Sequence, residues 1–112
     1  MNTTQTPMDL LRQVAPEFAK NQMDAKALLF EDPKYQEVPG KYKLLMGIAV
    51  AAALGSEMCT EMWTRQAKEK GVTNQEIIEA IMVARFMKQA TVNDTAAKTF
   101  ARLSDNVQPA QS

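Results

Sequence analysis

The feature that most constrains this fold is an apolar stretch at residues 44–54, which ends at a glycine, Gly55. A membrane-spanning helix needs about 20 such residues, so this stretch is too short to cross a bilayer. It is apolar on nearly every side of a helix, which predicts burial on most of its faces. The segment around residues 77–87 is similarly apolar, and one layer of helices in a small chain cannot bury both. We therefore predict that part of this surface is buried between the subunits of a homo-oligomer.

Proline, glycine and capping residues divide the rest of the chain into helices. Pro16 suits the first position of a helix that ends before Pro33, and Gly55 and Gly71 suit helix C-termini. Ser56 can cap one helix and Thr73 can open another. No segment alternates in the way that a strand does. The predicted fold is all-α, with about six helices at residues 8–14, 16–32, 41–54, 57–70, from 73 onward, and 93–103.

Length and cysteine usage bound the organisation of the chain. Its 112 residues allow one domain, predicted at residues 1–106, followed by a flexible polar tail at residues 107–112. The N-terminus lacks the basic and apolar regions of a signal peptide. A single cysteine cannot form an internal disulfide, so the expected compartment is the cytoplasm.

The charge balance and the absence of histidine narrow the chemistry. With 13 basic and 13 acidic side chains, the net charge is zero, which argues against nucleic acid or an anionic membrane as partner. No histidine is present, so the commonest general base and metal ligand is missing. Cys59 is the only cysteine. We expect neither a metal site nor a cofactor.

Most of the chain resembles the carboxymuconolactone decarboxylase family, a helical group that includes the alkylhydroperoxidase D-like proteins. The matching text includes APEF from Ala15, KYKLL from Lys41, IAVA from Ile48, ALGSEMC from Ala53 and KGVT from Lys70. It continues with Thr64-Arg65, Ala67, Glu76-Ile77, Glu79-Ala80 and Val83-Ala84. The resemblance implies a compact helical protomer that assembles into trimers or hexamers, with active sites at or near subunit contacts.

In the redox members of that family, a CxxC pair opens the fourth helix, where the dipole and free amides favour a thiolate. A histidine four residues after the second cysteine and a glutamate one helix earlier relay the proton from the attacking thiol. At these four relay positions the present chain has Ser56, Cys59, Trp63 and Leu44. Ser56 cannot form a disulfide with Cys59, and tryptophan and leucine cannot relay a proton. The dithiol mechanism is therefore excluded, which leaves at most single-cysteine chemistry at Cys59.

Several residues have two interpretations. Cys59 is either a peroxidatic or sensor thiol or, as we favour, a small apolar side chain without an acid–base partner. Ser56 is better explained as a helix cap than as a nucleophile, and Trp63 either lines a ligand pocket or belongs to the core. Residues predicted to line a pocket at the old active site are Leu44, Ser56, Met58, Cys59, Met62 and Trp63.

The charged residues of two helices are also open to two interpretations. Glu57 and Glu61 could perform acid–base work, but with Arg65 they are more simply a solvated or intersubunit charge ladder. Arg85 and Lys88 interrupt an apolar helix, and they either reach an anionic ligand at a subunit contact or mark the solvent edge of that helix.

Three functions fit these observations. The first is a peroxiredoxin-type thiol oxidoreductase with a degenerate relay, which works through Cys59 alone. The second is a non-catalytic oligomer that binds a small molecule or serves as a scaffold. The third is a decarboxylase of the carboxymuconolactone type, although such members use histidine side chains and this chain has none.

Overall fold

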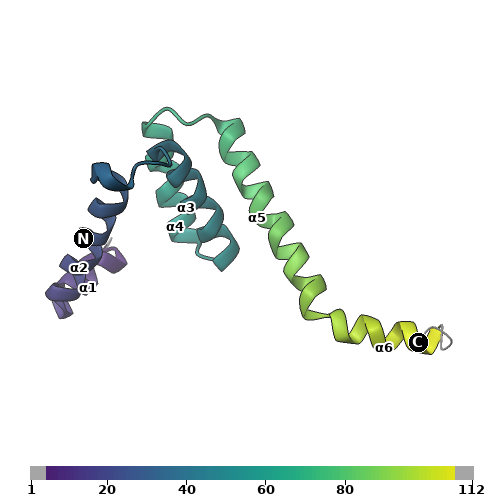
Figure 1. The fold of residues 1–112 in the computed structure, drawn as a ribbon. Helices are drawn as coiled ribbons and strands as arrows, with labels where there is room; N and C mark the ends of the chain where they lie inside the picture. Colours follow the sequence, from purple (N-terminus) through teal and green to yellow (C-terminus); the bar gives the residue numbers. More distant parts are fainter. Residues whose placement is uncertain (1–4, 108–112) are drawn as a thin grey trace. The chain divides into compact units, whose positions relative to one another are not determined.

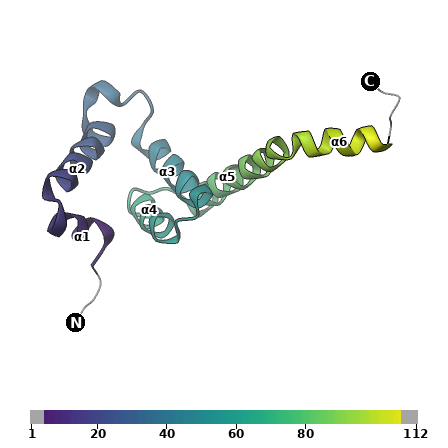
Figure 2. The ribbon, with the colours of Figure 1, turned by 90° about the horizontal axis from the view of Figure 1, so that it is seen from below.

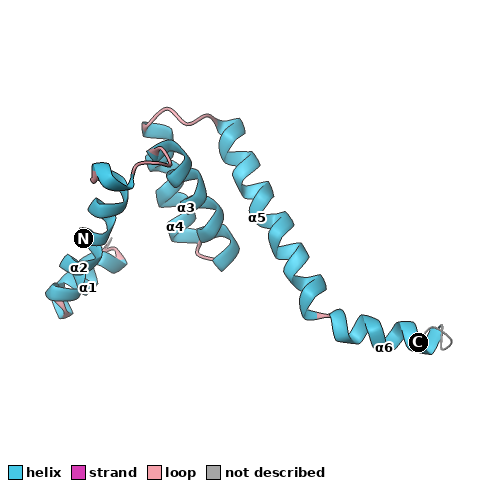
Figure 3. Ribbon diagram, viewed as in Figure 1, coloured by secondary structure: helices cyan, strands magenta, loops and turns pink. Residues whose placement is uncertain are grey.

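The computed structural model describes residues 5–107, which are all-α and contain no strand, as Figure 3 shows. The helices are α1 (Pro7–Val14), α2 (Pro16–Glu31), the 3₁₀ turn η1 (Pro33–Tyr35), α3 (Gly40–Leu54), α4 (Glu57–Glu69), α5 (Asn74–Thr95) and α6 (Ala97–Val107) (Figure 1). The prediction of an all-α fold with six α-helices is thus confirmed. The chain divides between Lys43 and Leu44 into two compact units, which we describe separately.

The first unit contains α1, α2 and η1 (Figure 2). Thr6 caps α1 in a capping box: its hydroxyl accepts a hydrogen bond from the Asp9 amide, and the Asp9 carboxylate accepts one from the Thr6 amide. Only Ala15 separates α1 from α2, and α2 begins at Pro16 as the sequence predicted. Ala19, which is 2% exposed, is the one residue of α2 classed as buried.

A lysine side chain holds the C-terminal end of α2. The ammonium of Lys43 donates hydrogen bonds to the backbone carbonyl of Leu29, at 2.6 Å, to that of Tyr35, and to the side-chain oxygen of Gln36, at 3.3 Å. The Gln36 amide donates in turn to the carbonyls of Leu29 and Asp32, each at 3.0 Å. Carbonyls left without partners at the end of a helix are satisfied in this way.

In the second unit, the helix ends lie where the sequence predicted them. Gly55 and Gly71 have φ values of 80° and 87°, the left-handed conformation that ends α3 and α4. Ser56 caps α4, and Thr73 with Glu76 forms the capping box of α5. These predictions are confirmed. They could be made from the sequence because each helix end depends on a few adjacent residues.

The core of the second unit consists of small and medium aliphatic residues. Ile48 of α3 is completely buried, and the other buried residues are Leu44, Ala51, Ala67, Val72, Ile77 and Ala84. Leu44, Ile48 and Ala51 follow the spacing of one helix face, whereas Met46, Val50 and Leu54 are exposed. Within the described chain, α3 therefore buries one stripe and not most of its faces.

The C-terminal boundaries differ from the prediction. Helix α5 continues through Asn93 to Thr95, and the last helix begins at Ala97 and ends at Val107. No glycine or proline interrupts residues 74–107, so Asn93 and Asp94 do not stop a helix that is already formed. Val107 is thus helical, and residues 108–112 of the predicted tail lie outside the described part of the chain. None of the described helices combines the length and the hydropathy that a bilayer span requires.

Candidate functional site

Cys59 lies in the first turn of α4, and Ser56 occupies the N-cap position before it. The Ser56 hydroxyl accepts a hydrogen bond of 3.3 Å from the Cys59 amide, which is the usual capping contact. The Cys59 side chain is half-buried and its thiol is free. This hydrogen bond joins two of the four relay positions.

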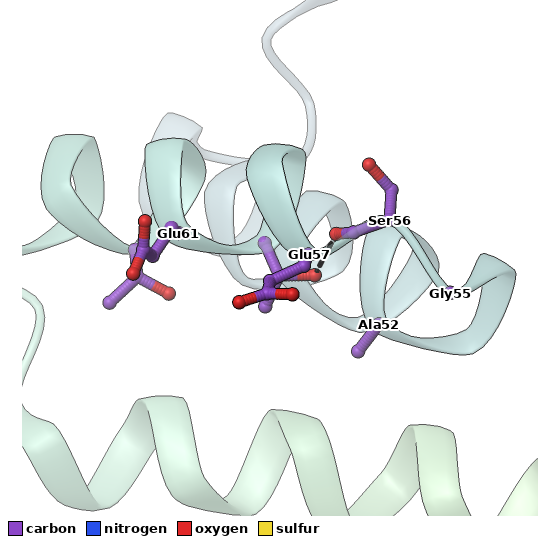
Figure 4. A pocket seen from close by; sticks show the side chains of 7 residues that line it. Ala52, Gly55, Ser56, Glu57 and Glu61 are labelled. Atoms are coloured by element: carbon purple, nitrogen blue, oxygen red, sulfur yellow. Dashed lines mark hydrogen bonds between the residues drawn. The ribbon is translucent and has the colours of Figure 1, made fainter.

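The backbone of Ser56 also anchors the start of α4. Its carbonyl accepts hydrogen bonds from the Thr60 hydroxyl, at 2.7 Å, and from the Thr60 amide, at 3.0 Å. Figure 4 shows the hydroxyl contact as a dashed line. These contacts support the predicted role of Ser56 as a helix cap, because its hydroxyl bonds to the backbone amide of Cys59.

The two other relay positions are occupied by packing residues. Leu44 is 6% exposed and belongs to the core. Trp63 is half-buried and lies against α3: a methyl group at Gly47 would be 3.7 Å from Cδ2 of the indole. The indole thus fills space beside a residue without a side chain. Of the two interpretations of Trp63, this contact favours packing.

The methionines of the predicted pocket have different environments. Met58 is 57% exposed, whereas Met62 is half-buried. Leu44 on α3 is buried, so the structure distributes the six predicted residues between core and surface. A ligand pocket formed by all of them stays a prediction.

An open pocket of about 400 Å³ lies where α3 ends and α4 begins. Its lining residues are Ala52, Gly55, Ser56, Glu57, Thr60, Glu61 and Thr64. Of the predicted site residues, Ser56, Glu57 and Glu61 line this pocket, but Cys59 does not. The alanine and threonines were not predicted, although the spacing of four between Ser56, Thr60 and Thr64 places three hydroxyls on one helix face.

The Glu57 and Glu61 carboxylates project from the same side of α4 (Figure 4). Both side chains are exposed, and within the described residues neither they nor Arg65 form an ion pair. The solvated or intersubunit charge ladder of Glu57, Glu61 and Arg65 stays a prediction. Glu57 still stabilises the helix, because an anion in the first turn interacts favourably with the dipole.

Potential metal ligands do not cluster in the part of the chain that the structure describes. No group of three or more histidine, cysteine, aspartate or glutamate side chains is close enough to hold an ion there. The carboxylate pair of Glu57 and Glu61 thus lacks a third protein ligand from these residue types.

Comparison with known proteins identifies a family. The model of the carboxymuconolactone decarboxylase family matches residues 16–101, most of the chain, and the match spans both compact units. No curated protein and no solved structure gives a significant match. Of the four relay positions, Leu44 lies in the first half of α3, Ser56 is the N-cap of α4, and Cys59 and Trp63 lie within α4. The chain belongs to the carboxymuconolactone decarboxylase family.

Proposed function

We propose that this chain is a family member with a degenerate redox site, in which Cys59 is the only group left for thiol chemistry. The observation that supports the proposal is structural: three of the four relay positions serve packing or capping. Leu44 is buried, Trp63 lies on Gly47, and Ser56 caps α4. A proton relay cannot operate through such groups.

Cys59 can still react as a single thiol. Its thiolate sulfur attacks an oxygen of a hydroperoxide, an S–O bond forms, the O–O bond breaks, and an alcohol leaves. The resulting sulfenic acid condenses with an external thiol, which releases water and leaves a mixed disulfide. A second external thiol then restores Cys59. Because Leu44, Ser56 and Trp63 cannot remove the first proton, we expect this cycle to run near the rate of free cysteine.

The test is a measurement of thiol loss with tert-butyl hydroperoxide, with dithiothreitol as the reductant. Above the direct reaction of dithiothreitol with peroxide, the wild-type chain should consume peroxide through one thiol and near the rate of free cysteine, and Cys59→Ser should add nothing to that background. The matched control Ser56→Ala should react as the wild type does. A rate orders of magnitude above free cysteine would overturn the proposed degeneracy, and unchanged turnover in Cys59→Ser would exclude Cys59.

A second candidate is a non-catalytic homo-oligomer that binds a small molecule or acts as a scaffold. It is favoured by the apolar surface of α5, where Ile78, Met82, Val83, Phe86 and Met87 are each about half exposed or more. Several exposed apolar side chains on one helix are typical of a protein–protein contact. The trimer or hexamer that the family resemblance implies would cover it.

This candidate is tested by the mass of the assembly in solution. Analytical ultracentrifugation should give a multimer for the wild type and a monomer for Phe86→Glu, because a buried charge without a partner opposes association. The control Gln22→Glu places the same charge at an exposed position of α2 and should remain multimeric. A monomeric wild type would rule out the oligomer, and a retained small molecule in native mass spectrometry would distinguish the binding protein from the scaffold.

A further inference from the structure

A second, smaller pocket lies where the last turn of α3 meets the middle of α5, and it shares Ala52 with the pocket at the start of α4. Its volume is about 170 Å³, and its lining residues are Ala52, Ala53, Ile81, Ala84, Arg85 and Lys88. Four of the six are small or aliphatic. None of the four relay positions lines it, so it is independent of the thiol chemistry proposed above.

The apolar wall of this pocket depends on small side chains. Ala84 is 7% exposed and belongs to the core, and Ala52, Ala53 and Ile81 are half-buried. A larger side chain in place of any of the alanines would occupy the space. The volume is below the roughly 300 Å³ at which drug-sized ligands begin, so the pocket suits a short molecule.

Two cations lie at one side of the pocket. Arg85 and Lys88 are three residues apart on α5, so they share one face of the helix. Within residues 5–107, ion pairs join Arg12 to Asp9 and Lys20 to Asp24, but neither Arg85 nor Lys88 has an anionic partner. Two neighbouring like charges repel each other, and an anion between them would relieve that repulsion.

The C-terminus of α3 opposes an anion here, because a helix carries about half a negative charge at its C-terminal end. Part of this negative potential is already compensated, since the Ala52 carbonyl accepts a hydrogen bond of 3.1 Å from the Gly55 amide. Two full positive charges exceed about half a negative one, so the site is positive overall.

We propose that this pocket binds a small organic carboxylate with a short unbranched apolar chain. The guanidinium of Arg85 has the fork of N–H donors that matches a carboxylate, and the ammonium of Lys88 adds a second donor and charge. The aliphatic chain lies against the alanines and Ile81. Tight binding requires both the charge and the apolar contact, because Arg85 and Lys88 are exposed and an ion pair that is exposed to water is weak.

The experiment is a titration of the full chain with butanoate, followed by the amide shifts of Ala84 and Arg85 in NMR spectra. Butan-1-ol has the alkyl chain of butanoate without its charge, and formate has the charge without the alkyl chain. Butanoate should bind more tightly than either. Equal binding of butan-1-ol, equal binding of formate, or no saturable shift with butanoate would each overturn the proposal.

Variants locate the site. Arg85→Gln and Lys88→Gln are exposed substitutions and should each weaken butanoate binding about tenfold, the effect of losing one charged hydrogen bond. Arg102→Gln removes an exposed arginine of α6 and should bind as the wild type does. Ala53→Leu should fill the space that the alkyl chain of butanoate occupies, and so weaken butanoate binding, but it should leave formate binding unchanged. Wild-type affinity in the Arg85→Gln, Lys88→Gln double variant would show that butanoate binds elsewhere.

Discussion

The indole of Trp63 on α4 lies against Gly47 on α3, where a methyl group would be 3.7 Å from Cδ2 and 3.9 Å from Cγ of the ring. Both distances are ordinary van der Waals contacts, and nothing closer surrounds Gly47. The relay position at which redox relatives have a histidine thus holds a large apolar group, and the facing residue is small enough to admit it. The indole of Trp63 therefore takes part in the packing of α3 on α4.

The first prediction follows from the space beside Gly47. Gly47→Ala should raise the free energy of unfolding by about 0.5–1 kcal/mol, because alanine is favoured over glycine inside a helix and no clash opposes it. Urea denaturation measures the change. As a control, Gly71→Ala should destabilise the protein, because Gly71 has a φ of 87°. A loss of stability in Gly47→Ala would mean that the indole needs a closer contact with the backbone.

Helix ends could be predicted from sequence because each follows from a few adjacent residues. Gly55, Ser56, Gly71 and Thr73 lie where the sequence placed them. The break at Ala96 could not be predicted in the same way. The last helix was expected to begin near Asn93, a residue with capping chemistry, but an established helix continues through such residues unless tertiary contacts or a stronger breaker end it.

The sequence indicates which residues occupy the relay positions, but it does not indicate what packs around them. That Leu44, Ser56 and Trp63 occupy relay positions is a prediction from the resemblance to the family. The burial of Leu44, the contact of Trp63 with Gly47 and the pocket beside Arg85 depend on how α3 approaches α4 and α5, which local sequence does not encode. The same holds for Lys43, whose three acceptors lie up to fourteen residues earlier in the chain.

The second prediction concerns that lysine. Lys43→Met keeps much of the side chain's length and apolar volume but removes the donor to Leu29, Tyr35 and Gln36. The loss should cost about 1 kcal/mol, since the contacts are partly exposed to water. Hydrogen exchange of the amides in the last turn of α2 should become faster. Lys34→Met is the control, because the Lys34 side chain has no such partner among the described residues; an equal effect in both variants would contradict the role given to Lys43.

The third prediction is a pH dependence of α1. Hydrogen bonds from the Thr6 amide and hydroxyl, together with the charge of Arg12, hold the pKa of Asp9 below its ordinary value of 3.8. A carboxyl whose pKa is lower in the folded state stabilises that state above the ordinary pKa, and this contribution disappears as the pH falls through the lowered pKa. The exchange protection of α1 should therefore decrease in acid, below about pH 4. In Asp9→Asn, α1 should be less protected at neutral pH and lose this acid dependence, whereas an unchanged acid dependence would assign it to another group.

The fourth prediction separates capping from redox chemistry at Ser56. The Ser56 hydroxyl accepts the Cys59 amide at 3.3 Å, so Ser56→Ala should lower the free energy of unfolding by about 1 kcal/mol, the usual cost of losing a helix cap. Ser56→Cys restores the CxxC spacing, and under diamide oxidation the two thiols should join in an intramolecular disulfide, seen as the loss of two hydrogens in the intact mass. Its peroxide turnover should nevertheless remain slow, because Leu44 and Trp63 still provide no proton relay. Fast turnover in Ser56→Cys alone would show that a paired thiol is sufficient and that the relay positions at Leu44 and Trp63 are dispensable.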